Sequence, residues 1–448
     1  MRTSHCRQAI GLLAATALVL AACGGDDDDA ADPPPATDAP AGTDAPAGTD
    51  APAETEPPST EPSTDTTPAD TTPADTTPTD TEPAGELPEG VPTELGEGEG
   101  AVNLIAWAGY VEDGSTDPAV DWVTDFEADT GCSVNVTLGN SSDEMVQLMQ
   151  TGEYDAVSAS GDATLRLIAG GEVVPVNVDL IPNYANIFDD LKLQPHNSID
   201  GVPYGVPHGR GANLLVYNTE LYTTPPDSWG EMFEDSTAAP GAVSIYDSPI
   251  YIADAALYLM AHQPDLGITN PYSLDQEQFD AAIALLEQQA DIAGQYWSLY
   301  TDQQAALEGG TALVGTTWQV IVNLAQANGA SIDAVKPVEG ATGWSDTWMI
   351  SSKAAHPNCA YMWLDHIASP EANAAVAEWF GEAPSNAESC ALTAVPEHCD
   401  IFHAAETAYW EDVYYWTTPT EECLDGRTDV TCVPYTEWVN AWNSLRAG

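Results

Sequence analysis

The stretch Val102-Asn103-Leu104-Ile105-Ala106-Trp107 decides how the folded part of this chain begins. It is an apolar run long enough for a buried strand. A helical pattern at 119–128 that Gly131 ends, a strand at 133–138, a helix at 143–150 with Ser142 as its candidate N-cap, and a strand at 154–158 follow it. This β-α-β-α-β order predicts a parallel sheet with helices on both faces and ligands beyond the carboxyl ends of its strands.

A second set of elements begins near Gly211. It contains apolar strands at 213–217, 242–246 and 312–318 and a helix at 275–290, for which Ser273 and Gln276 form a candidate capping box. About 350 residues is more than one core usually supports. We therefore predict an α/β fold of two lobes with a ligand cleft between them.

The predicted lobes exchange segments of the chain. Lobe I comprises residues 99–216 and 346–388, and lobe II comprises residues 217–345 and 389–448. Where one lobe's sequence interrupts the other's, we expect a hinge with crossover strands, near residues 210–218, 340–346 and 386–392.

The first 98 residues have a different composition. Two arginines and the apolar run 10–20 precede Leu20-Ala21-Ala22-Cys23, which resembles a bacterial lipobox. Residues 1–22 are therefore predicted to be a lipoprotein signal peptide and Cys23 the lipidated residue, and the alternative is a secretory signal whose cysteine is incidental. Residues 23–98 repeat Thr-Asp-Ala-Pro and Asp-Thr-Thr-Pro, which is typical of a disordered acidic linker. We expect an extracytoplasmic protein, lipid-anchored to the cell membrane at the cell surface or in the periplasm.

The charge balance is strongly acidic. The chain has 71 Asp and Glu residues against 9 Lys and Arg residues, a formal net charge of −62. We expect no nucleic-acid binding, because such binding needs clustered basic side chains. Such a field attracts small cations, but an acidic surface is also an adaptation to salt, and the charge alone does not choose between the two.

Six cysteines remain once Cys6 leaves with the signal peptide and Cys23 takes lipid. An even number outside the cytoplasm indicates disulfides. The simplest pairing joins the neighbours Cys390 with Cys399 and Cys423 with Cys432, and leaves Cys132 with Cys359. Metal binding is the rival interpretation, but no Cys-x-x-Cys or tight Cys/His cluster is present, so we expect neither a metal nor a cofactor.

Aromatic residues and a carboxylate follow several predicted strands. Trp107 and Tyr110 follow the first strand, Trp318 ends a later one, and Trp344 stands two residues before Asp346. Tyr414-Tyr415-Trp416 form a further cluster. Aromatic faces with a carboxylate suit an organic cation, which the ring quadrupole attracts and the carboxylate pairs with. The alternative is that these rings are core residues that happen to end strands.

These residues also carry a family resemblance. Asn103-Leu104-Ile105-Ala106-Trp107-Ala108-Gly109-Tyr110 resembles the opening strand of the extracytoplasmic solute-binding proteins of ABC transporters, in particular the spermidine/putrescine-binding group. Further motifs come in the family's order: Glu153-Tyr154-Asp155-Ala156-Val157, Gly201-Val202-Pro203-Tyr204-Gly205, Ser228-Trp229, Gly343-Trp344-Ser345-Asp346, and Ser369-Pro370-Glu371-Ala372 through Gly381 to Pro384-Ser385-Asn386. The resemblance covers nearly all of residues 101–448. It implies a two-lobe fold like that of periplasmic binding proteins, a monomer, ABC permease subunits as partners and no enzymatic activity.

The resemblance also implies a ligand site. It places aromatic walls at Trp107, Tyr110, Trp318 and Trp344, pocket-lining hydroxyls at Ser158 and Ser160, and an amine-pairing carboxylate at Asp346. The chain departs from the family at two places. The family's acidic pair in the second lobe appears as Ser248 and Tyr251, with Asp247 one place off, and its late tyrosine appears as Glu382. The predicted ligand-binding set is therefore Trp107, Tyr110, Ser158, Ser160, Asp247, Tyr251, Trp318, Trp344, Asp346 and Glu382.

Arg210, in His208-Gly209-Arg210-Gly211, lies at the predicted lobe crossover. Its guanidinium could hold a ligand carboxylate, which would favour an amino acid or betaine-like solute, or it could form a structural ion pair.

Three classes of function stay open at this point: a binding protein, a secreted hydrolase and a wall-associated structural protein. A lipid-anchored binding component of an ABC importer for a small cationic, polyamine-like solute fits the two lobes, the lipobox and the resemblance. Within the same class, a binding protein for a sugar, amino acid or betaine-like solute is the alternative. A secreted hydrolase and a wall-associated structural protein fit less well, since no Gly-x-Ser-x-Gly, His-Glu-x-x-His or Cys/His arrangement is evident.

Overall fold

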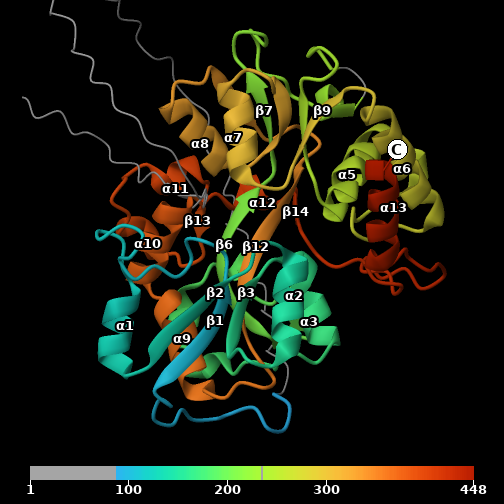
Figure 1. The fold of residues 1–448 in the computed structure, drawn as a ribbon. Coiled ribbons are helices and arrows are strands. Elements are labelled where there is room, and N and C mark those ends of the chain that lie inside the picture. The colour runs from blue at the N-terminus through green and yellow to red at the C-terminus, as the bar shows by residue number, and fades with distance from the viewer. Residues whose placement is uncertain (1–86, 234–235, 448) are drawn as a thin grey trace, which may run out of the picture. The chain divides into compact units, whose positions relative to one another are not determined.

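The computed structural model describes residues 87–233 and 236–447, which belong to one compact unit with two β-sheets (Figure 1). The first sheet has the strand order β13-β6-β12-β3-β1-β2, and β14 pairs with β12 off this path. Its strands are β1 (Ala101–Ala106), β2 (Ser133–Leu138), β3 (Ala156–Ala159), β6 (Gly205–Ala212), β12 (Ala341–Ile350), β13 (Ala383–Pro384) and β14 (Val413–Tyr415).

The β-α-β-α-β prediction for the start of the fold is confirmed. β1 pairs in parallel with β2 on one edge and with β3 on the other. Its side chains alternate between two cores. Val102 and Leu104 pack with α1 (Val123–Thr130) and α9 (Pro357–Ile367), whereas Ile105 packs with α2 (Ser142–Thr151) and α3 (Gly161–Ala169). A strand buried on both faces needs apolar side chains on both, which explains why β1 is apolar except at the partly buried Asn103.

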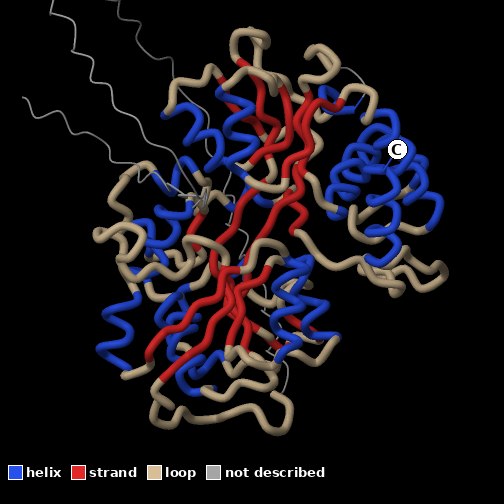
Figure 2. The backbone as a smooth tube through the Cα atoms, viewed as in Figure 1, coloured by secondary structure: helices blue, strands red, loops and turns tan. Residues whose placement is uncertain are grey.

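The second sheet has the order β11-β7-β10-β8-β9. Its strands are β7 (Leu214–Asn218), β8 (Val243–Tyr246), β9 (Ala293–Trp297), β10 (Val314–Thr317) and β11 (Ile332–Val335). Only Asn213 separates β6 from β7, so the chain passes directly from the first sheet to the second there, and it returns between β11 and β12. Figure 2 shows strands of one sheet running on into those of the other.

Helices cover the second sheet as well. They are α4 (Gly230–Phe233), α5 (Ile252–His262), α6 (Gln276–Gln289), α7 (Tyr300–Glu308), α8 (Gln319–Ala327) and α13 (Tyr435–Ala447). Leu215 of β7 packs into the core that contains α5 and α6, and Val216 packs into the core that contains α7 and α8. The remaining elements are α10 (Pro370–Phe380), α11 (His398–Ile401), α12 (Thr407–Trp410) and the short pair β4 (Ser198–Ile199) and β5 (Val202–Pro203).

The predicted lobe boundaries cut two strands. The boundary after residue 216 falls inside β7, and the boundary at residue 346 falls inside β12. In addition, β14, which belongs to the predicted lobe II, pairs with β12 in the first sheet. The lobes as sequence segments remain a proposal, while the two-sheet α/β architecture is observed.

Two predicted helix caps are wrong. The N-cap of α2 is Ser141, whose hydroxyl accepts the amide hydrogen of Glu144, so Ser142 lies inside the helix. The capping box of α6 joins Asp275 and Gln278 rather than Ser273 and Gln276. In both cases an eligible residue stands one or two places from the true cap, and a short side chain at either position satisfies the same sequence pattern.

All three predicted disulfides are confirmed: Cys132 with Cys359, Cys390 with Cys399, and Cys423 with Cys432. The first fastens α9 to the loop between α1 and β2, and the other two close short loops in the C-terminal part.

The predicted signal peptide, Cys23 and most of the predicted linker lie outside the described residues. At the described end of that linker, Leu95 packs against the core of the first sheet and the amide of Gly96 donates to Asn358 Oδ1 at 2.7 Å. Within residues 87–233 and 236–447, no helix combines the length and the apolar character that a membrane span requires.

Candidate functional site

The candidate site lies where β12 changes its strand partners. On one edge, residues 341–343 pair with β14 and residues 347–350 pair with β3. On the other edge, the pairing with β6 shifts register between Asp346 and Thr347. Trp344 and Asp346 are buried between these partners, two residues apart, so both lie on the same face of the strand.

Asp346 accepts hydrogen bonds from two hydroxyl groups. Ser160 Oγ donates to Asp346 Oδ1 at 2.6 Å, and Tyr110 Oη lies 2.9 Å from Oδ2. Ser160 follows β3 and is the N-cap of α3, but its side chain makes no capping bond, so its hydroxyl is free to bind Asp346. Tyr110 follows β1 after a turn at Gly109, where φ is +94°. The carboxyl ends of two parallel strands thus supply the partners of Asp346, and such ends are where the sequence analysis expects ligands to bind.

A second carboxyl group, that of Glu382, faces the same tyrosine. Glu382 Oε2 is 3.2 Å from Tyr110 Oη. The left-handed Gly381 (φ +86°) ends α10, and the amide of Glu382 donates back to Ala377 O, so the chain reverses toward the sheet at this point. His208 completes the group: its Nε2 is 3.6 Å from Glu382 Oε1, and its Nδ1 accepts from Trp348 Nε1 at 3.1 Å.

Two glycines of β6 make room for the site. A Cβ atom on Gly209 would lie 2.3 Å from the carboxyl carbon of Glu382. A Cβ atom on Gly211 would lie 2.5 Å from the ring of Trp344. Real Cβ atoms do not approach other atoms so closely, so both side chains need glycine opposite them.

Burial controls the protonation of these groups. It raises the pKa of Asp346 to about 6 and the pKa of neighbouring Asp162 to about 6. Burial, together with the charge of Asp346, raises the pKa of Glu382 well above its usual range. Burial lowers the pKa of His208 to about 3, so this imidazole is neutral. In the described part of the chain, neither Lys nor Arg forms an ion pair with Asp346 or Glu382.

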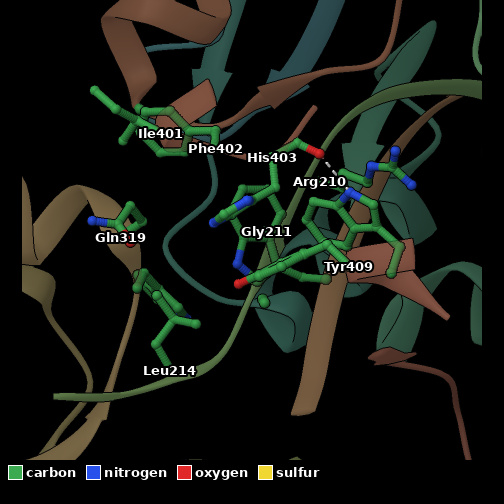
Figure 3. Close-up of a pocket in the computed structure, with 13 residues that line it drawn as sticks. Arg210, Gly211, Leu214, Gln319, Ile401, Phe402, His403 and Tyr409 are labelled. Atoms are coloured by element: carbon green, nitrogen blue, oxygen red, sulfur yellow. Dashed lines mark hydrogen bonds between the residues drawn. The ribbon is translucent and has the colours of Figure 1, made fainter. Parts of the chain in front are cut away.

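Trp318 and Trp344 line one pocket, which measures about 350 Å³ including its part open to solvent (Figure 3). Figure 3 shows Leu214 and Gln319 on one side of it and Arg210 and Tyr409 on the other. Trp318 Nε1 donates to Asn213 Oδ1 at 3.0 Å, which fixes its ring at the crossing between the sheets. Trp344 stands two residues from Asp346 on β12, but Asp346 itself does not line this pocket.

The other predicted site residues lie in three different surroundings. Trp107 is partly buried beside the cores of the first sheet, and its Nε1 is buried without a hydrogen-bond partner. Ser158 is buried opposite Trp348, and its Oγ also lacks a partner.

Asp247 accepts from Trp442 Nε1 at 3.0 Å and pairs with Arg446 at 3.1 Å. Tyr251 lies in the core of the second sheet, where its Oη accepts from Gln289 at 2.9 Å. The structure therefore does not bring Asp247 and Tyr251 to the Asp346 group.

Arg210 forms the structural ion pair that was one of its two interpretations. Its Nη1 donates to Asp190 at 2.7 Å and to Tyr415 Oη at 3.1 Å, and its Nη2 donates to Ala404 O at 2.9 Å. The guanidinium also lies 4.2 Å from the ring centre of Trp410. Its side chain is buried and both terminal nitrogens are occupied by protein acceptors.

Sequence reasoning missed His208, Asp162 and Thr418, and it named Trp416 without placing it in the predicted ligand-binding set. His208 and Asp162 carry no strand-end signal, although the two glycines around Arg210 could have indicated that β6 passes close to other side chains. Trp416, from the late aromatic cluster, stacks on Tyr246 of β8 with 5.7 Å between ring centres, while its amide donates to Gly343 O. Next to it, Thr418 Oγ1 donates to Asp162 O at 2.8 Å. This segment therefore contacts both sheets beside the site.

Comparison with known families gives a match to the model of bacterial extracellular solute-binding proteins over residues 121–400. Two curated proteins are similar in sequence. Spermidine/putrescine-binding periplasmic protein 1 of Haemophilus influenzae is 23% identical over 324 residues, which are 69% of this chain and 84% of that protein. The putrescine/agmatine-binding protein of Pseudomonas aeruginosa is 24% identical over 305 residues, which are 64% of this chain and 78% of that protein.

Solved structures show the same fold. The spermidine/putrescine ABC transporter substrate-binding protein of Streptococcus pneumoniae superposes with a TM-score of 0.61 at 16% identity, covering 78% of this chain and 97% of that one. The predicted resemblance and the predicted two-lobe, periplasmic-binding-protein-like architecture are both confirmed by these matches.

Proposed function

Because this chain belongs to the family of bacterial extracellular solute-binding proteins, we propose that it is the lipid-anchored substrate-binding component of an ABC importer. Its solute is a small cation of the polyamine class, as in the relatives whose names state spermidine, putrescine or agmatine. The protein delivers this solute to permease subunits and does not convert it.

One observation carries this proposal: Asp346 is a buried carboxylate that has hydroxyl partners but no basic partner in the described structure. A buried charge is costly unless a counter-charge compensates it. An ammonium group of a bound solute supplies that counter-charge. A neutral sugar does not, and an anion would add to the repulsion.

The aromatic residues supply the rest of the proposed site. Trp318 and Trp344 border an aromatic pocket, and Trp344 stands two residues from Asp346 on β12. A cation near the face of such a ring gains about 0.5–2 kcal/mol. Tyr110 and Ser160 hold the carboxylate, and Trp107 and Ser158 offer buried polar atoms without partners. We leave Asp247 and Tyr251 out of the ligand contacts, since Arg446 and Gln289 already engage them.

The anchoring and the transport cycle are further parts of the proposal. Lipidation at Cys23 tethers a monomer to the membrane, and the predicted linker, residues 23–98, acts as a spacer up to the part near Leu95 that packs against the first sheet. Solute binding closes the two sheets and their helices about the β6–β7 and β11–β12 connections. Small-angle scattering should then show a smaller radius of gyration with saturating solute.

A thermal-shift screen tests the proposed solute class, because a ligand that binds only the folded state raises the melting temperature. The panel should contain putrescine, spermidine, agmatine, glycine betaine, a neutral amino acid and a sugar. We expect the three polyamine-class compounds to raise the melting temperature. A shift with the sugar or the neutral amino acid alone would refute the cation assignment.

A further inference from the structure

Tyr110 Oη has two carboxyl neighbours but only one hydrogen. It lies 2.9 Å from Asp346 Oδ2 and 3.2 Å from Glu382 Oε2, both within hydrogen-bond distance. A phenol can donate to one carboxylate, and its oxygen can accept from another group. The second carboxyl must therefore carry a hydrogen of its own, or two lone pairs would face each other in a buried place.

The surroundings decide which carboxyl carries that hydrogen. Asp346 already accepts from the hydroxyl of Ser160 at 2.6 Å, and it is bordered by the N-terminal end of α3, which favours a negative charge. Glu382 is fully buried against the backbone of Gly209, and the ring that faces it is the imidazole of His208. Asp346 is thus the better place for the charge.

The hydrogen bond of His208 fixes the tautomer of its ring. Its Nδ1 accepts from the indole Nε1–H of Trp348, so in the neutral ring the hydrogen is on Nε2, which faces Glu382 Oε1. The separation of 3.6 Å is too long for a hydrogen bond, and neither atom has another partner among the described residues, but the N–H favours a bare oxygen at Oε1. The other oxygen of Glu382, Oε2, is then the one that carries a hydrogen toward Tyr110.

We propose that Glu382 is a neutral carboxylic acid and a positioning residue: its Oε2–H donates to Tyr110 Oη, which turns the tyrosine hydrogen onto Asp346. Asp346 then carries the only negative charge of this pair. If the chain binds a polyamine-class cation, as the proposed function states, the buried end of the site holds one ammonium group of that cation. The other charges of a longer cation lie toward the aromatic pocket.

The charges around Glu382 agree with this assignment. The titratable groups that face it come from the loop after β1 (Tyr110), from β6 (His208) and from β12 (Asp346). His398 Nε2 donates to the backbone oxygen of Glu382 at 2.8 Å and does not contact its carboxyl group. None of them is a cation at neutral pH, because burial lowers the pKa of His208 to about 3. Burial and the charge of Asp346 hold the pKa of Glu382 well above its usual range.

Infrared spectroscopy of the ligand-free protein tests the protonation state directly. A protonated carboxyl has a C=O stretching band separate from the bands of a carboxylate. At about pH 8, Asp162, Asp254 and Asp346, whose pKa values are about 6, 7 and 6, are mostly ionised and contribute little to it. We expect a protonated-carboxyl band in the parent protein that Glu382→Gln removes and that Glu371→Gln, on the exposed start of α10, leaves in place. Absence of the band, or its persistence in Glu382→Gln, would overturn the inference.

Putrescine binding adds a second readout. A glutamine at 382 keeps a donor toward Tyr110 and an acceptor toward His208, so Glu382→Gln should bind putrescine within about threefold of the parent. Glu382→Ala loses the donor and should bind about tenfold more weakly. If Glu382 were a second charged ligand contact, Glu382→Gln would weaken binding as much as Asp346→Asn, and the inference would fail. If the parent does not bind putrescine at all, the proposed function fails, while the infrared result still decides the state of Glu382.

Discussion

Putrescine should bind more weakly as the pH is lowered through 6. Burial raises the pKa of Asp346 from its ordinary 3.8 to about 6 in the ligand-free protein. A cation binds the ionised carboxylate, so below pH 6 binding must first expel the proton from Asp346. The amines of putrescine stay protonated throughout this range, because alkylamines such as that of lysine titrate near pH 10. The ligand's own charge therefore does not change.

The size of the effect can be calculated from the same pKa. At pH 8 nearly every molecule has an ionised Asp346, whereas at pH 5 a group with a pKa of about 6 is protonated in about ten molecules for each ionised one. The apparent Kd should rise about tenfold between pH 8 and pH 5. The raised pKa also means that burial disfavours the ionised form by about 3 kcal/mol, which a bound ammonium group would offset.

The buried carboxyl groups of Asp162 and Asp346 change folding stability with pH in the opposite direction from ligand affinity. Asp162 and Asp346 have folded-state pKa values above their unfolded values, so between about pH 4 and 6 the folded state binds more protons than the unfolded state. Their contribution to stability therefore increases as the pH falls from 7 to 5. Weaker binding at pH 5, with an undiminished melting temperature, is the expected combination.

Titration calorimetry with putrescine at several pH values between 5 and 8 measures how the apparent Kd depends on pH. Asp346→Asn supplies the control, because removal of the titrating group should flatten the profile. An affinity that is constant or increases as the pH falls would refute the reasoning, as would an unchanged slope in Asp346→Asn.

Three further predictions concern the aromatic pocket residue Trp344, the glycine Gly209 of β6 and the proposed lipidation site Cys23. Trp344→Ala should weaken putrescine binding about tenfold by calorimetry, through loss of the cation–π contact and of buried surface, and unaltered affinity would remove Trp344 from the site. Gly209→Ala should lower both the melting temperature and the affinity, because its Cβ would meet the Glu382 carboxyl at 2.3 Å; a parent-like variant would contradict the packing described. Cys23→Ser should release the protein from the membrane fraction, and retention with a cleaved signal peptide would rule out the lipid anchor.

The first three strands of the first sheet could be predicted from the sequence pattern. β1, which lies between two helix layers, is apolar except for Asn103, and β2 spans Ser133–Leu138 as expected although its side chains are exposed or half-buried. Helix caps were less predictable. At α6, Ser273 and Asp275 each stand three residues before a glutamine, and only the fold shows that Asp275 makes the bonds.

The centre of the site was predictable in part. Tyr110, Ser160 and Asp346 come together because parallel strands bring their carboxyl ends to one edge, which sequence order can indicate. Glu382 was identified only through a family resemblance, as a departure from its pattern. Its proton and its contact with His208 depend on how α10 ends against β6, which is a tertiary contact without a local signal.

Asp247 and Tyr251 illustrate the opposite case. In the sequence, Tyr251 matches one position of the family's acidic pair and Asp247 stands one place from the other. In the structure, both side chains contact the C-terminal helix α13 instead. Arg446 of α13 binds Asp247, while Trp442 packs against Tyr251 at 5.9 Å between ring centres. A partner almost two hundred residues away cannot be inferred from spacing.

The most direct test of the account compares putrescine binding to the parent protein and to Asp346→Asn by titration calorimetry at neutral pH. The substitution nearly preserves shape and removes the charge that the ammonium group pairs with, so the Kd should rise about tenfold to a hundredfold. Glu287→Gln, which removes one exposed carboxylate from α6, should leave the Kd unchanged at 0.15 M salt, where charges are screened over about 8 Å. If Asp346→Asn binds putrescine as tightly as the parent does, the buried carboxylate is not what holds the solute and the central claim is wrong.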